Sequence, residues 1–234
     1  MVISVDSGSQ ERLLRALAEQ IKLPLIQIAR QAELSQLTCS DKALKSIEYT
    51  ADMAIRLIDS YLLSIHLQTQ ASLELEPVSV GAILQDTAHR LDRLAKEYNC
   101  TLEVHLTGRY EPVMANRQSL EAAYTMLGYA FIESAPPVAL KHQVILGAHR
   151  SQKGVVAGIF GTQPGLSADA FRRGKAIFGS SRQGLPAVSS ASGAGIFLAE
   201  SLLKSMETPL RQSRHRKCGG LAATLLTSKQ LQLI

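Results

Sequence analysis

The stretch of sequence that decides the fold spans residues 11–67 and reads ERLLRALAEQIKLPLIQIARQAELSQLTCSDKALKSIEYTADMAIRLIDSYLLSIHL. Apolar residues recur in it at steps of three and four, the spacing that keeps one stripe of a helix facing a partner helix. We therefore predict two long amphipathic helices joined by a short polar turn. The stripes are Leu14, Leu17, Ile21, Leu25, Ile28 and Ala32, then Leu44, Ile47, Ala51, Ala54, Ile58, Tyr61 and Ile65.

This helical hairpin carries more apolar residues than two helices can bury. Leu13, Leu34, Leu57 and Leu62 flank the two stripes. A second copy of the hairpin would complete a four-helix bundle, so residues 1–70 are expected to form a dimerisation domain and the protein a homodimer. The alternative is that the hairpin packs on the downstream part of its own chain.

Residues 71–234 show a different pattern, in which short strands alternate with helices. Cys100–Leu106 alternates at period two and predicts a strand, and Asn116 is a plausible N-cap for the helix that follows it. The fold class is therefore α+β, with a sheet covered on one face by helices. The expected helices are 80–99, 117–134, 196–205 and a short piece at 168–178; the expected strands are 100–106, 113–115, 142–149, 155–160, and 211–216 paired with 221–227 across Gly219-Gly220.

The composition is that of an ordinary globular protein, with 46% hydrophobic and 19% charged residues. No apolar run approaches the roughly 20 residues that span a membrane. The N-terminus lacks the features of a signal peptide, and the three cysteines have neither metal-ligand nor disulfide spacing. We expect a cytoplasmic protein with no membrane partner. A basic cluster at 211–217 has no aromatic residue to stack on bases, so nucleic-acid binding is not expected.

Pro24 stands in the middle of the first predicted helix, where it should kink the helix. The sequence around it, Glu19-Gln20-Ile21-Lys22-Leu23-Pro24-Leu25, resembles the H-box of sensor histidine kinases, whose usual form is H-E-L-R-T-P-L. In that family the first residue is the histidine that accepts the phosphoryl group. Here Glu19 takes its place, so the resemblance implies a helical phosphoacceptor domain without its acceptor.

The resemblance extends over about residues 11–228 and implies an ATPase-type catalytic domain after the hairpin, in the form of an α/β sandwich. Asn116 and Leu120 stand where the family opens its N-box helix. Gly219-Gly220 resembles the start of the family's terminal strands. Further similar segments are Glu76-Pro77-Val78, Gly165-Leu166-Ser167 and the Gly-rich loop Ser192-Gly193-Ala194-Gly195-Ile196, whose counterpart cradles phosphates.

The departures from the family pattern bear on nucleotide binding. The family uses a carboxylate to accept a hydrogen bond from the adenine amino group, and Gly161 stands at that position. It uses an N-box asparagine to hold Mg²⁺, and Ala130 stands there by ungapped spacing, or Tyr129 after a slip of one residue. No Asn or Asp occurs from Arg117 to Lys141. We therefore expect ATP and Mg²⁺ to bind weakly or not at all at a degenerate site around Ala130, Gly161, Gly165, Gly193 and Gly195.

The resemblance implies a role in two-component signalling, by dimerisation and by binding a response-regulator receiver domain or a sibling kinase. Receiver domains dock in this family on the helical bundle below the H-box. The matching zone here is Ile21, Lys22, Leu25, Ile26, Ala29 and Leu57. Two alternatives stay open: a divergent kinase or phosphatase that still binds nucleotide, and a histidine phosphotransfer protein, a class that normally keeps the histidine.

Overall fold

The structure is a computed structural model of the whole chain, and it describes residues 21, 24–33, 41–69, 73–133, 142–161 and 190–228. The chain divides into two compact units, Met1–Thr69 and Gln70–Ile234. Among the described residues, no helix is both long and apolar enough to cross a membrane.

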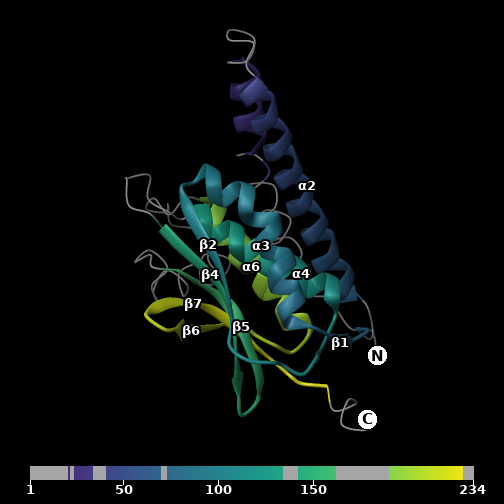
Figure 1. Cartoon of the computed structure of the whole chain (residues 1–234). Helices are drawn as coiled ribbons and strands as arrows, with labels where there is room; N and C mark the ends of the chain where they lie inside the picture. Colours follow the sequence, from purple (N-terminus) through teal and green to yellow (C-terminus); the bar gives the residue numbers. More distant parts are fainter. Residues whose placement is uncertain are drawn as a thin grey trace, which may run out of the picture. The chain divides into compact units, whose positions relative to one another are not determined.

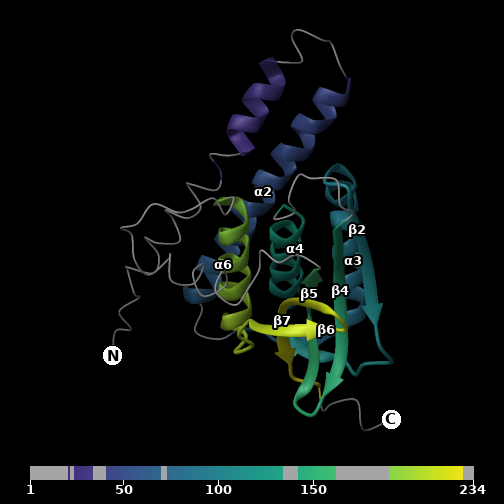
Figure 2. The same cartoon turned by 90° about the vertical axis from the view of Figure 1, so that its left-hand side faces the viewer.

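The first unit is the helical hairpin. Residues 24–33 are helical, and α2 runs from Asp41 to Thr69. The two segments run antiparallel, with 24–33 beside the first half of α2 (Figures 1 and 2). Pro24 is buried within the helical segment. The kink expected at Pro24 involves Lys22 and Leu23, which lie outside the described residues.

Helix α2 has a buried stripe and an adjacent, more exposed apolar stripe rather than the single predicted one. The buried stripe contains Ala54 and Tyr61, which are 7% and 4% exposed, whereas Ile55 and Leu62 one position further on are 54% and 55% exposed. The predicted stripe contains residues of both, because Ala54 and Tyr61 are buried whereas its other members are exposed or half-exposed. The apolar surface of α2 is wide enough for either stripe to follow the heptad spacing. The buried stripe is Thr50, Ala54, Leu57, Tyr61 and Ser64; the exposed or half-exposed stripe is Leu44, Ile47, Ala51, Ile55, Ile58, Leu62 and Ile65.

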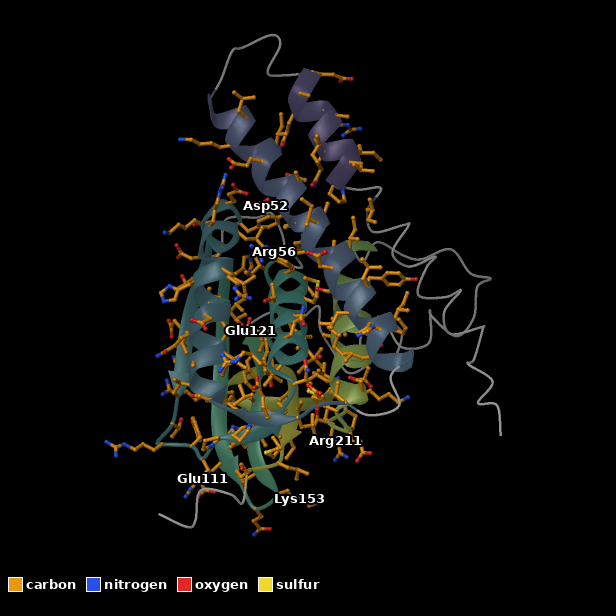
Figure 3. The ribbon with its side chains drawn as sticks, turned by 90° about the vertical axis from the view of Figure 1, so that its right-hand side faces the viewer. Asp52, Arg56, Glu111, Glu121, Lys153 and Arg211 are labelled. Atoms are coloured by element: carbon orange, nitrogen blue, oxygen red, sulfur yellow. The ribbon has the colours of Figure 1, made fainter. Side chains whose placement is uncertain are left out.

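The second unit contains a five-stranded sheet in the order β2-β4-β5-β7-β6. Strands β2 and β4 are parallel, and the remaining neighbours are antiparallel. A separate two-stranded ribbon pairs β1 with β3. The strands are β1 (Glu76–Val78), β2 (Cys100–Leu106), β3 (Val113–Ala115), β4 (His142–Ser151), β5 (Gly154–Gly161), β6 (Arg211–His215) and β7 (Cys218–Leu225). Figure 3 shows Lys153 at the turn between β4 and β5, and Arg211 where β6 begins.

Three helices cover one face of this sheet (Figures 1 and 2). They are α3 (Val80–Glu97), α4 (Arg117–Glu133) and α6 (Ser190–Ser205). The α+β class with helices on one face is thus confirmed. Helix α4 lies between the other two and is buried along most of its length. Its start is fixed as predicted, because the Asn116 side-chain oxygen accepts a hydrogen bond from the Ser119 amide at 2.9 Å.

The largest differences from the predicted boundaries are at the start of α6 and at the turn between β6 and β7. Helix α6 begins at Ser190, six residues earlier than expected. The turn between β6 and β7 is made by Arg216 and Lys217, with Arg216 at a φ of 54°, so Gly219 and Gly220 lie inside β7 and not in the turn. A side chain at 220 would overlap the carbonyl oxygen of Ile159 on β5. The glycine there permits close strand approach.

Candidate functional site

The candidate site is built around the second half of α4, where three of the residues predicted for a nucleotide site come together. A β-carbon added at Gly195 of α6 would lie 3.5 Å from the Ala130 side chain and 2.9 Å from the carbonyl oxygen of Met126. One added at Gly161, the last residue of β5, would lie 3.3 Å from Phe131. The glycines thus let α6 and β5 pack closely on α4.

This part of the domain is apolar and closely packed. Ala130 is 1% exposed and Phe131 is 1% exposed, and Gly161 is buried. Gly161 has no side chain that could accept a hydrogen bond from adenine. Its own backbone belongs to the sheet, where its register partners are Val144 and Gly219.

Neither carboxylate of α4 is suited to holding a metal ion. Glu121 is engaged at both oxygens, by Arg90 at 3.0 Å and by Arg117 at 3.7 Å; Figure 3 labels it on α4. Glu133 ends the helix, and burial raises its pKa to about 7. It is therefore largely protonated below neutral pH, when a carboxyl group binds Mg²⁺ poorly. Among the described residues, no three His, Cys, Asp or Glu side chains are placed to hold a metal ion.

The remaining predicted nucleotide-site residues are only partly described. Gly193 lies in the first turn of α6, close in sequence to Gly195. Gly165 lies outside the described residues, as does the predicted helical piece at 168–178. In the described part of this predicted site, Ala130 is a buried methyl group and Gly161 is a buried residue without a side chain.

The predicted partner-binding residues lie in the hairpin. Leu25 and Ile26 are 56% and 41% exposed, and Ala29 is exposed as well. Ile21 is half-buried. Leu57, at 9% exposed, is buried and does not contribute to an accessible surface. Glu19 and Lys22 lie outside the described residues.

Two features relevant to function were not predicted from the sequence. The first is the exposed stripe containing Ile55 and Leu62, since periodicity alone does not tell which of two adjacent stripes is buried. The second is the raised pKa of Glu133, which no pattern in the sequence indicates. Of the two, only the exposed stripe had a signal in the sequence, because Leu62 is one of the apolar residues that two helices cannot bury.

Comparison with known proteins identifies the fold. No protein-family model matches the sequence, and no curated protein matches it either. Among solved structures, Acinetobacter baumannii histidine kinase AdeS is 11% identical with a TM-score of 0.58, over 89% of this chain and 97% of that one. A nucleotide-free catalytic domain of histidine kinase ThkA is 8% identical with a TM-score of 0.54, over 66% and 97%.

Two further similar structures were solved as complexes. Full-length ShkA with AMPPNP is 17% identical with a TM-score of 0.57, over 93% of this chain and 46% of that one. Histidine kinase ThkA with the response regulator protein TrrA is 10% identical with a TM-score of 0.54, over 92% and 61%. At these identities the likeness establishes architecture alone. This chain has the fold of the histidine kinase catalytic domains.

Proposed function

We propose that this protein is a catalytically degenerate histidine-kinase-like signalling protein. It acts by forming a homodimer and by binding a receiver domain or a sibling kinase, and it binds ATP weakly or not at all. The observation that carries this proposal is the packing of Ala130 against α6 at Gly195. The residue expected to ligate Mg²⁺ is a buried methyl group, and an apolar side chain has no lone pair for a metal.

The dimer is supported by the exposed stripe of α2. Its apolar residues recur at steps of three or four, and Leu44, Ile55 and Leu62 are 60%, 54% and 55% exposed. Five of the eight large hydrophobic side chains that are exposed among the described residues lie in the hairpin, where a soluble monomer rarely keeps so contiguous an apolar face. A second hairpin would bury this stripe in a four-helix bundle.

The partner is supported by the exposed residues next to the H-box-like segment. Leu25, Ile26 and Ala29 present a small apolar surface on the first helix. One similar kinase, ThkA, was solved in complex with a response regulator. The docking surface proposed here is therefore Leu25, Ile26 and Ala29, with the half-buried Ile21 at its margin. Lys22, which the sequence also predicts for this zone, lies outside the described residues.

The test is a binding and phosphorylation assay on receiver domains and kinases from the same genome. The wild-type protein should bind at least one of them, and Ile26→Asp should weaken that binding at least about tenfold, as loss of a central apolar contact does. The exposed Glu48→Gln on α2 is the control and should bind as wild type. Radiolabelled ATP should leave the receiver unlabelled; labelled receiver would favour the divergent-kinase alternative, and binding to neither class would contradict the proposal.

A further inference from the structure

An interacting group of histidines lies on the face of the sheet opposite the helices. His105 of β2 and His215 of β6 approach each other, with His105 Nδ1 3.3 Å from His215 Nε2. Their strands are at opposite edges of the sheet. The contact therefore requires the end of the β6–β7 hairpin to fold back across the outer face, and we call residues 215–218 the hairpin tip.

The hairpin tip packs closely on β4 and β5. A β-carbon at Gly147 of β4 would lie 3.2 Å from the Phe160 ring and 3.4 Å from the His215 ring. His215 is only 7% exposed. Its ring packs on Phe160 with centroids 5.2 Å apart. Phe160 belongs to a small apolar cluster with Ile145, Cys218 and Ala222, so the hairpin tip helps to cover that cluster.

The charged groups around His215 come from three segments. Glu103 of β2 is 2.8 Å from His105 Nε2, and Gln143 of β4 donates a hydrogen bond to the other Glu103 oxygen at 2.7 Å. His149 of β4 has its ring centroid 6.3 Å from that of His215. Arg216 follows His215 in the turn. The carboxylate thus faces His105, whereas His215 has three basic neighbours.

The hydrogen bond between His105 and His215 can persist when one of the two rings is protonated, but not when both are. When both rings are neutral, His105 donates from Nε2 to Glu103 and accepts at Nδ1 from His215 Nε2. With one added proton, one of the two facing nitrogens still donates and the other still accepts. With two, both facing nitrogens carry hydrogen, and two cationic N–H groups point at each other across 3.3 Å. That state has no hydrogen bond and has like charges in contact.

We propose that the hairpin tip is a pH-operated latch, docked on the outer face while His105 and His215 share at most one added proton and released when both are protonated. Burial, followed by the charges of His105, Arg216 and His149, lowers the pKa of His215 below its ordinary value of 6.5. Because the folded-state pKa of His215 is depressed, the contribution of its neutral ring to docking is complete above pH 6.5 and is lost as the pH falls below it. Hydrogen bonds from Gln143 and His105 lower the pKa of Glu103 from 4.5, so that group titrates below this window.

Hydrogen exchange of backbone amides in the full chain tests the latch, in buffers containing a chelator to remove metal ions. Between pH 7.5 and 5.0, the protection of the β6 and tip amides should fall about threefold or more relative to β4 and β5 amides measured in the same sample. His215→Phe keeps an aromatic ring packed on Phe160 but removes the titratable imidazole, so it should abolish this pH-dependent loss of amide protection. His89→Gln, an exposed change on α3, is the control and should behave as wild type.

Two results would overturn the latch: unchanged relative protection of the tip in wild type between pH 7.5 and 5.0, or the same loss in His215→Phe. If His215→Phe does not fold, His105→Gln serves instead. It removes the second imidazole and should reduce the loss at least about twofold; an undiminished loss would contradict the proposal. A side-chain nitrogen correlation spectrum should also show His105 carrying its proton on Nε2 at pH 7.5.

Discussion

Ala130 is the residue on which the proposed loss of Mg²⁺ binding rests. It lies on α4, where it is buried and packs against Gly195 of α6. A metal-binding amide at this position would need both a free volume and a ligand to satisfy its polar atoms. The packing of α6 on Ala130 at Gly195 leaves little volume for such an amide.

Ala130→Asn should therefore fail to restore nucleotide binding. It should also lower the free energy of unfolding by about 1–3 kcal/mol, because a buried amide is left without partners and the contact with α6 is overpacked. Chemical denaturation measures the stability change. Gln118→Asn, exposed on the same helix, is the control and should stay within about 0.5 kcal/mol of wild type. Tight, Mg²⁺-dependent ATP binding by Ala130→Asn would show that the nucleotide cavity survives.

Glu133 should make the protein less stable as the pH rises. Burial raises its folded-state pKa from 4.5 to about 7, so its contribution is fully present below pH 4.5 and is lost as the pH rises through 7. Glu133→Gln should thus stabilise the protein by about 1–3 kcal/mol at pH 8 and by far less at pH 4.5. Denaturation at the two pH values checks this, with the exposed Glu48→Gln as control. Equal effects of Glu133→Gln at both pH values would refute the assignment.

At the scale of elements, the β5–β7 pairing explains a glycine pair that looks like a turn. Neither Gly219 nor Gly220 has a positive φ. A side chain at Gly220 would overlap Ile159 and Phe160, whereas one at Gly219 would meet no atom within 4 Å. Glycine is required at position 220 because β5 lies too close for a side chain there. The turn itself is made by Arg216 and Lys217.

Gly220→Ala and Gly219→Ala should consequently differ, although the residues are adjacent. Gly220→Ala should destabilise the domain by about 2 kcal/mol or more, since backbone atoms cannot yield as a flexible side chain can. Gly219→Ala should change stability by less than about 0.5 kcal/mol. Thermal denaturation of the two variants decides the matter. Similar large losses in both would mean that the glycines serve a shared turn.

The elements that were predictable from sequence are those whose signal is local. Helix α3 and strand β2 follow their apolar periods, and the Asn116 cap precedes a regular helix, so each agrees closely with its predicted range. The start of α6 was missed because Ser, Gly and Ala give a weak helical signal, and its first turns pack on α4. The β6–β7 register and the His105–His215 contact depend on residues far apart in sequence, which no local pattern contains.

At the scale of the whole molecule, the two units carry separate parts of the proposed function. In the proposal, the exposed apolar stripe of the hairpin serves association, whereas the sheet domain has the fold of histidine kinase catalytic domains but binds nucleotide weakly or not at all. Separate consequences follow. Association should persist without nucleotide, and loss of association should leave the fold of the second unit intact.

Ile55→Glu combined with Leu62→Glu should convert the dimer into a monomer. Both side chains are more than half exposed on α2, and two charges on each copy would oppose burial in a bundle. Sedimentation equilibrium measures the change. Arg56→Glu introduces the same change in net charge at an exposed polar position between them and should leave the dimer intact. A wild-type protein that sediments as a monomer would contradict the proposed bundle.

The most direct test of the central claim is calorimetric titration of the wild-type protein with ATP and Mg²⁺ up to millimolar concentration. The degenerate site predicts no saturable heat, or a dissociation constant in the millimolar range, where binding is worth only about 4 kcal/mol. Saturable, Mg²⁺-dependent binding at micromolar ATP would contradict the account, because the buried Ala130 and Gly161 would then have to belong to a working nucleotide site.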